Sequence, residues 1–247
     1  MRIAVISDIH GNMEAVEAVM DDIKKSGCEK LFVLGDYAMA GPEPKRTIKY
    51  FMDKANDSNV QMIQGNTDLM IADYTNDLFE TLKEKAPVMA SALQDDVKQI
   101  TPEEKLFLKN LPAQKQVDIE GVSFLLVHGS PRKNNEDILP DTPMENIEKM
   151  MEKVDAQVVL CGHTHIPCGF QTQSGKTVVN AGSIGRPFTT EAKSCYLIID
   201  VIDGKCVFEH RSTEYDNKKA SDKMKKRNFV GCELLADTLL NPEKRHF

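Results

Sequence analysis

Side chains that can bind metal ions recur in the sequence shortly after short apolar runs, with a glycine beside each group. The runs that precede them cover residues 3–6, 31–34, 60–63, 123–127 and 158–160. The groups that follow are Asp8, His10, Asp36, Asn66, His128, His163 and His165. A mixture of carboxylate, amide and imidazole donors suits Mn²⁺, iron or Zn²⁺ better than an all-oxygen magnesium site or a thiolate site. The pattern therefore predicts a centre for divalent metal ions.

Two of these motifs carry a pair of candidate ligands two residues apart. In extended backbone such side chains face the same way, so we expect Asp8 and His10 to reach one ion. His163 and His165 can do the same, or can aim their rings at adjacent ions. One Asp-x-His pair arises by chance in many proteins. Seven candidates that all follow predicted strands favour a functional centre over a structural role.

The apolar runs are short, rich in valine and isoleucine, and bounded by turn residues, as buried strands are. Similar runs occur at 177–179, 196–202 and 205–210. Asp203-Gly204, between the last two runs, predicts a hairpin. Because ligands of open α/β sheets bind at the carboxyl ends of strands, the candidate ligands are expected at one edge.

Helical patterning fills several of the gaps. One helix is predicted between the N-cap candidate Asn12 and Gly27, and others at 47–55 and 143–154. Early alternation of strands and helices implies parallel strands, and the hairpin adds antiparallel character. We therefore expect an α/β fold with two sheets packed face to face and helices outside.

The stretch from Asp68 to Pro112 is helix-rich and contains no convincing strand. We interpret it as a helical insertion at about residues 68–112 beside the site, and an elongated crossover connection is an equally supported alternative. A length of 247 residues suits a single domain over residues 1–247. The lysine-rich segment 216–227 is interpreted as a solvated helix face, because aspartate and serine dilute its charge.

Composition excludes several classes of function. The formal net charge of −7 argues against general nucleic-acid binding, although bound cations would still allow a phosphate substrate to bind. No apolar run approaches a membrane span or a signal sequence, so a cytoplasmic protein is expected. Six scattered cysteines without a CxxC motif are predicted to be reduced and buried. His210 and His246 are interpreted as ordinary polar residues.

Together the motifs resemble those of the calcineurin-like metallophosphoesterase superfamily. They are Asp8-x-His10, Gly35-Asp36, Gly65-Asn66, His128 and Gly162-His163-x-His165. Residues 6–15, 41–44 and 128–131 are also similar to a bacterial branch of diadenosine tetraphosphatase-like proteins and phosphodiesterases. The resemblance covers residues 3 to about 190 and implies a four-layer αββα sandwich of two mixed sheets flanked by helices.

The resemblance also implies a dinuclear mechanism. Two divalent ions are expected, with manganese favoured and iron or zinc as alternatives. One ion would take Asp8, His10, Asp36 and His165, and the other Asp36, Asn66, His128 and His163. A hydroxide that bridges the ions would attack phosphorus in line. Catalysis would then rest on Asp36, Asn66 and His128.

Residues around the expected centre bear on the substrate. Arg132 and Arg186 are candidates to hold phosphate oxygens, with solvated surface arginines as the alternative. Many family members have a histidine after the asparagine ligand, and that histidine helps to protonate the leaving group. Here Thr67 stands in its place, and Asp68 is not an obvious replacement.

The expected function is hydrolysis of phosphodiester or phosphoanhydride bonds in a small-molecule phosphate ester or nucleotide, with dinucleoside polyphosphates among the candidates. One alternative is a protein or small-molecule phosphomonoesterase, and the missing histidine argues against a protein phosphatase. A second alternative is an inactive scaffold of the same fold, as in the retromer subunit. The presence of a candidate at every ligand position argues against that scaffold.

Overall fold

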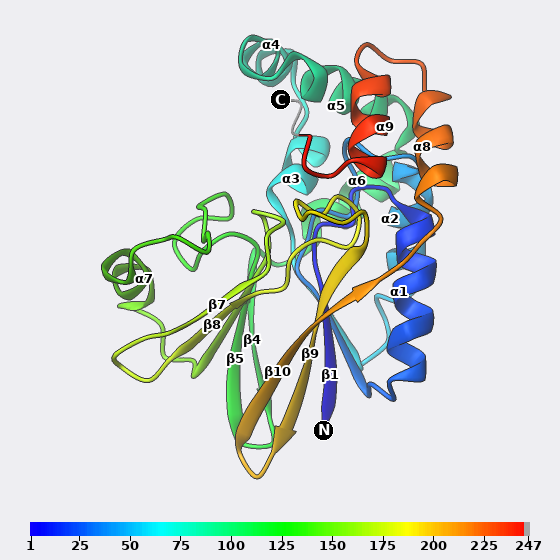
Figure 1. Cartoon of the computed structure of the whole chain (residues 1–247). Helices are drawn as coiled ribbons and strands as arrows, with labels where there is room; N and C mark the ends of the chain where they lie inside the picture. The colour runs from blue at the N-terminus through cyan, green and yellow to red at the C-terminus, as the bar shows by residue number, and fades with distance from the viewer. Residues whose placement is uncertain (245–247) are drawn as a thin grey trace.

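The computed structural model describes residues 1–244, so His246 lies outside it, and it is built around two five-stranded sheets (Figure 1). The first sheet has the order β10-β9-β1-β2-β3 and consists of β1 (Arg2–Ile6), β2 (Lys30–Val33), β3 (Val60–Met62), β9 (Ser194–Ile202) and β10 (Lys205–Thr213). The second has the order β4-β5-β6-β8-β7 and consists of β4 (Gln114–Ile119), β5 (Val122–Val127), β6 (Val158–Cys161), β7 (Cys168–Gln171) and β8 (Thr177–Asn180). The expected α/β fold with two mixed sheets is confirmed.

Strand direction follows the pattern of connections. In the first sheet β1, β2 and β3 run parallel, whereas β9 is antiparallel to β1 and forms the expected hairpin with β10. In the second sheet β5, β6 and β8 run parallel, and the edge strands β4 and β7 are antiparallel. Alternation along β1 sends Ile3 and Val5 into the core between the sheets, while Ala4 and Ile6 face the helices.

The described residues form helices at the outside of the sheets and at one end of the molecule (Figure 1). They are α1 (Met13–Lys25), α2 (Pro44–Met52), α3 (Asn66–Ala72), α4 (Asn76–Lys85), α5 (Pro87–Gln99), α6 (Pro102–Asn110), α7 (Met144–Met151), α8 (Asn217–Lys225) and α9 (Cys232–Leu240). Asn12 caps α1 as expected, because its Oδ1 accepts from the amide of Ala15 at 3.2 Å. Helix α2 begins three residues before the predicted 47–55 segment, since Pro44 fits the first turn.

Four helices, α3 to α6, occupy the strandless stretch between β3 and β4. Three elements were not expected from the sequence: β4, β7 and α9. β4 is a polar edge strand whose first three residues are exposed, so it has none of the continuous apolar character of a buried strand. α9 follows the lysine-rich helix α8 and packs against it.

Two expectations about side chains need correction. All six cysteines are unpaired, but Cys28, Cys168 and Cys206 are only partly buried. The lysines of α8 do not all face solvent, because Lys219 and Lys223 contact the buried carboxylate of Glu14 at 3.2 and 2.5 Å. Within residues 1–244 no helix is long and apolar enough to cross a membrane.

Candidate metal centre

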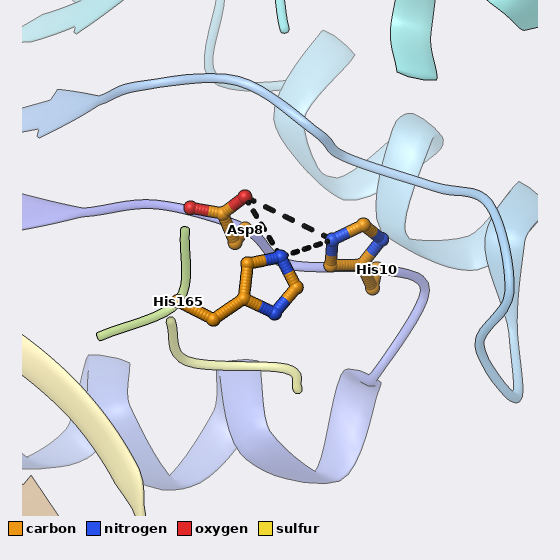
Figure 2. A group of neighbouring side chains, drawn as sticks. All are labelled: Asp8, His10 and His165. Atoms are coloured by element: carbon orange, nitrogen blue, oxygen red, sulfur yellow. Dashed lines mark hydrogen bonds and ion pairs between the residues drawn. The ribbon is translucent and has the colours of Figure 1, made fainter. Parts of the chain in front are cut away.

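The side chains predicted as ligands gather where the strands of both sheets end. Asp8 and His10 follow β1, and Asp36 follows β2 in the first sheet; His128 follows β5 in the second. Two groups of buried residues each have potential ligand atoms that all lie within 4.8 Å of one another. Asp8 belongs to both groups. The groups are Asp8, His10 and His165, drawn in Figure 2, and Asp8, Asp36 and His128.

In the first group two imidazoles and a carboxylate point toward one another (Figure 2). His165 Nε2 lies 3.2 Å from Asp8 Oδ1, and His10 Nε2 lies 3.8 Å from the same oxygen. The two Nε2 atoms are 3.1 Å apart. On the far side of each ring, Nδ1 contacts a backbone carbonyl, Met39 O at 2.9 Å for His10 and Arg186 O at 2.6 Å for His165.

These carbonyl contacts determine which nitrogen of each ring acts as an acceptor. A carbonyl oxygen can only accept, so Nδ1 of His10 and of His165 must carry the proton. In a neutral imidazole Nε2 then has a free lone pair, and the two lone pairs face each other beside Asp8 Oδ1. That oxygen is buried and has no hydrogen-bond partner. Acceptor atoms crowded in this way are suited to bind a cation.

The second group draws its residues from both sheets. His128 Nδ1 donates to Leu34 O at 2.6 Å, which leaves Nε2 3.4 Å from Asp36 Oδ2 and 3.8 Å from Asp8 Oδ1. Asn66 Oδ1 lies 3.0 Å from the same Nε2. The structure therefore places Asn66 beside His128 of this group.

His163 is close to the second group without belonging to it. Its ring centroid is 5.3 Å from that of His128, and its main-chain N–H donates to Asp8 Oδ2 at 2.9 Å. Its Nε2, however, lies 3.3 Å from Oδ1 of Asp137, a residue that the sequence did not single out.

The charges of these groups are strongly coupled. Burial acts to raise the pKa of Asp8 and Asp36, but the neighbouring imidazoles outweigh it, so the pKa of Asp8 lies well below its usual range and that of Asp36 is about 2. Burial and His165 lower the pKa of His10 to about 4. Burial also disfavours protonation of His128, yet the charges of Asp36 and Asp8 raise its pKa to about 10. The carboxylates thus remain ionised and attract cations.

The backbone at the ligands differs from what the sequence predicted. Asp-x-His and His-x-His were expected to be extended, but five of the ligand residues have positive φ. They are Asp8 (54°), His10 (46°), Asp36 (57°), His163 (68°) and His165 (61°). Aspartate and histidine are among the few residues enriched in this region. The side chains converge because the chain turns sharply at each of them, whereas Gly65 allows close approach, since a Cβ there would lie 2.1 Å from Asp36 Oδ1.

Asp68 is a buried residue beside the site, and its position there was not predicted from the sequence. Its Oδ2 accepts from the amides of Asp36 and Gly65, both at 2.8 Å, and its Oδ1 accepts from that of Tyr37 at 3.0 Å. Burial and the charge of Asp36 raise its pKa to about 7, whereas the three N–H donors favour the carboxylate. A signal was present in the sequence, because Gly65 to Asp68 has the spacing of a capping box at the start of α3.

The two candidate substrate arginines have different surroundings. The guanidinium of Arg132 is half exposed and paired with Glu136, and Arg132 lines a cavity of about 170 Å³ together with His128. Arg186 is only 6% exposed, and no carboxylate of residues 1–244 forms a salt bridge with it. Burial lowers its pKa to about 10. Its Nη1 contacts Met89 Sδ of α5 at 3.8 Å, so the helical stretch reaches the site.

The sequence is similar to a family of known proteins. A family model for the calcineurin-like phosphoesterase superfamily domain matches residues 1–204. The chain belongs to this superfamily. The expected resemblance is therefore confirmed, and the protein is a phosphoesterase by family, a class of hydrolases that use divalent metal ions.

Individual relatives and solved structures are similar to the chain over nearly its whole length. An uncharacterized protein of Methanocaldococcus jannaschii is 31% identical over 243 residues, which cover 92% of this chain and 93% of the relative. The crystal structure of a hypothetical protein from Pyrococcus horikoshii has a TM-score of 0.86 at 26% identity and covers 99% of both chains. A metallophosphoesterase from Sphaerobacter thermophilus has a TM-score of 0.79 at 23% identity, covering 98% of this chain and all of its own, and so shares the fold.

Proposed function

We propose that this phosphoesterase hydrolyses phosphodiester or phosphoanhydride bonds with two divalent metal ions, with manganese favoured and iron or zinc as alternatives. The observation that carries the proposal is the pair of Nε2 atoms, on His10 and His165, that lie 3.1 Å apart beside the unpartnered Oδ1 of Asp8. Without a cation, three acceptors would repel one another in a buried space. The donor set of the site therefore fits a metal.

The ligands divide naturally between two ions. Asp8, His10, Asp36 and His165 would hold one, and Asp36, Asn66, His128 and His163 the other. Asp36 is suited to bridge, because its Oδ2 is 3.6 Å from His10 Nε2 and 3.4 Å from His128 Nε2. Divalent ions held there would lower the pKa of water and neutralise phosphoryl oxygens. The protein's part is to fix the rings of His10, His128 and His165 by their carbonyl contacts and to keep both carboxylates ionised.

Arg186 is the better supported of the two substrate-binding candidates. A buried guanidinium without a carboxylate partner is unusual, because burial of a charge is costly unless it is paired. A phosphate group of the substrate would supply the missing partner through forked hydrogen bonds. Arg132 would first have to leave Glu136, so we expect it to contribute less.

The local sequence after Asn66 favours substrates whose leaving groups are weak bases. The amide of Thr67 donates to Asp36 Oδ1 at 2.9 Å, and its buried hydroxyl is too weak an acid to protonate a leaving alkoxide. Asp68 is fully used as an acceptor for backbone amides. Phosphate and aryl oxide groups can depart without a proton, so dinucleoside polyphosphates and aryl phosphodiesters are the preferred substrate classes.

The test is to compare rates across aryl and alkyl esters and dinucleoside polyphosphates with the manganese-loaded protein. General acid catalysis typically supplies about 10²–10⁴-fold, so alkyl monoesters should be poor substrates, and the rate should fall steeply as the leaving group becomes more basic. Thr67→His should narrow that gap. A flat dependence would contradict the assignment of substrate class. Efficient hydrolysis of phosphoserine would favour the phosphomonoesterase, and no turnover of any ester would favour the scaffold.

We also propose that residues 1–247 are a single domain in which residues 68–112 are a helical insertion that forms a flap over the site. The contact between Met89 and Arg186 supports this role. The six unpaired cysteines support a reducing compartment such as the cytoplasm.

A further inference from the structure

The loop of residues 34–43, which follows β2, holds His10 in place. Its Met39 carbonyl accepts from His10 Nδ1 at 2.9 Å. The loop also lies directly against the main chain of His10, since a Cβ on Gly41 would be 1.4 Å from His10 O. Met39 and Ala40 have positive φ, at 70° and 60°, a backbone region that such residues adopt only where their surroundings impose it. The position of His10 therefore depends on the groups that hold this turn.

Two buried charged side chains hold the turn. Asp96 of α5 is fully buried, and its Oδ2 accepts from the amide of Ala40 at 3.1 Å. Arg227, two residues after the end of α8, has a side chain only 5% exposed, and its Nη1 donates to the carbonyl of Gly41 at 2.6 Å. The same Nη1 forms an ion pair with Asp96 Oδ1 at 2.6 Å. An arginine from the C-terminal part of the chain and an aspartate from the helical stretch thus meet at the turn that holds His10.

The guanidinium of Arg227 is fixed by further contacts. Its Nε donates to Asp95 Oδ2 at 3.1 Å, and its Nη2 donates to the same oxygen. Its central carbon lies over the ring of Phe229, 5.1 Å from the ring centroid. Lys223 of α8 adds a second link to the loop, because its Nζ donates to Glu43 Oε2 at 2.6 Å. Since the planar fork serves a carbonyl and two carboxylates at fixed angles, an ammonium group could not replace it fully.

We propose that Arg227 is a positioning residue for His10, through the turn that carries the Met39 carbonyl. The inference rests on the proposed dinuclear function. Arg227 lies beyond residues 1–204, the part of the chain that matches the superfamily model. Without its guanidinium, Asp96 would keep a buried charge with no cation beside it, and the turn would lose a donor. The ring of His10 would then lose its fixed orientation, on which the affinity of a ligand for metal depends.

The effect should fall on one of the two proposed ions. His10 is a candidate ligand of one ion, whereas His128 is a candidate ligand of the other. The ring of His128 is held by the carbonyl of Leu34, whose own amide donates to Ile6 O of β1 at 2.9 Å. That anchor is independent of the C-terminal contacts. A loss that is selective for the His10 ion therefore distinguishes a positioning role from general support of the fold.

The first experiment follows hydrogen exchange of main-chain amides in metal-free wild-type and Arg227→Met protein. The amide of Ala40 should exchange roughly 10-fold faster or more in the variant, the size expected for loss of a hydrogen bond to a charged group. The amide of Ala181, which donates to a carbonyl of the second sheet, should be unchanged. Arg211→Met is the matched control, because it removes a guanidinium that is paired with Glu209 on β10, and it should change neither amide.

The second experiment titrates Mn²⁺ into chelator-treated protein by calorimetry, with His10→Ala to identify the binding step of the His10 ion. Arg227→Met should weaken that step by roughly 10-fold, at the lower end of what loss of a ligand's orienting partner causes, and leave the other step unchanged. Arg227→Lys keeps a cation beside Asp96, so it should fold normally and show a smaller loss at the same step. Arg211→Met should change neither step.

Unchanged exchange of the Ala40 amide in Arg227→Met, or equal weakening of both binding steps, would overturn the inference. If the methionine variant does not fold, Arg227→Lys provides the test, and wild-type exchange together with wild-type affinity in that variant would overturn the inference as well. Failure of wild-type protein to bind two ions would instead contradict the dinuclear function. The exchange measurement separates that case, because it is made without metal.

Discussion

At the scale of single residues, the candidate site depends on groups that position its side chains as much as on the candidate ligands themselves. The Leu34 carbonyl holds the ring of His128, and the Asp68 carboxylate holds the main-chain amide of Asp36. The second of these, Asp68, receives three backbone amides and ties the two loops that carry Asp36 and Asn66 to each other. Substitutions at candidate ligands and at the residues that hold them should therefore have different effects on metal affinity and on the free energy of unfolding.

Asp36→Asn tests the bridging carboxylate. The amide keeps the shape of the side chain but removes a charge that both ions would share, so metal affinity and turnover should fall together, with turnover lower by at least about 10²-fold. Metal content by elemental analysis and the rate with an aryl phosphodiester are the measurements. A variant with full activity and full metal content would exclude Asp36 as a bridge.

Asp68→Ala tests the amide acceptor. Buried N–H groups without partners are costly, so we expect a loss of roughly 2–4 kcal/mol in the free energy of unfolding. Urea denaturation in the presence of a chelator measures the loss without a contribution from metal. Asp73→Ala is the matched control, because its exposed ion pair with Lys109 should contribute less than about 1 kcal/mol. Equal effects of the two substitutions would refute the role of Asp68.

At the scale of elements, much was predictable because apolar strands and polar ligands alternate along the chain. The buried strands, and the five loops after them that carry candidate ligands, could be located from the sequence, since a buried strand has a continuous apolar pattern. The edge strands β4 and β7 could not, because exposed edges lack that pattern. The contact between His163 and Asp137 was also inaccessible, since it joins loops 26 residues apart whose path depends on tertiary anchors such as Ile138.

The helices from α3 to α6 are proposed to form a flap over the site, and this role can be tested by substitution. Met89 of α5 contacts Arg186, so Met89→Ala should weaken the packing of α5 against the site. We expect the KM for bulky dinucleoside polyphosphates to change several-fold and the KM for a small aryl diester to change little. Leu106→Ala on α6, where the side chain is 56% exposed, is the control. If both substrates respond alike to Met89→Ala, this helical stretch does not select substrates.

At the scale of the molecule, the centre joins the two sheets. The ring of His128, after β5, donates to Leu34 at the end of β2, and the amide of His163 donates to Asp8 after β1. Each proposed ion would add further links, because it takes ligands from loops of both sheets. Metal binding and folding are therefore expected to be coupled.

Removal of metal should lower thermal stability. One ion present at 100 times its dissociation constant stabilises the folded state by about 2.7 kcal/mol. For a chain of this size that corresponds to a shift in Tm of roughly 5–10 °C. Differential scanning calorimetry with and without chelator measures the shift, and Asp36→Asn should show a smaller one. An unchanged Tm in wild-type protein would mean that the sheets associate independently of the metal.

The left-handed backbone at five of the candidate ligands limits how the proposed centre could be re-engineered. Swapping an aspartate for glutamate, or a histidine for cysteine, is the usual route to a new metal preference. Here each swap would also place a residue poorly suited to positive φ at a sharp turn, at a cost of order 1–3 kcal/mol per position. Asparagine tolerates that region well. New metal specificity would therefore be easier to obtain from residues that hold the candidate ligands, such as Asp68, than from the candidate ligands themselves.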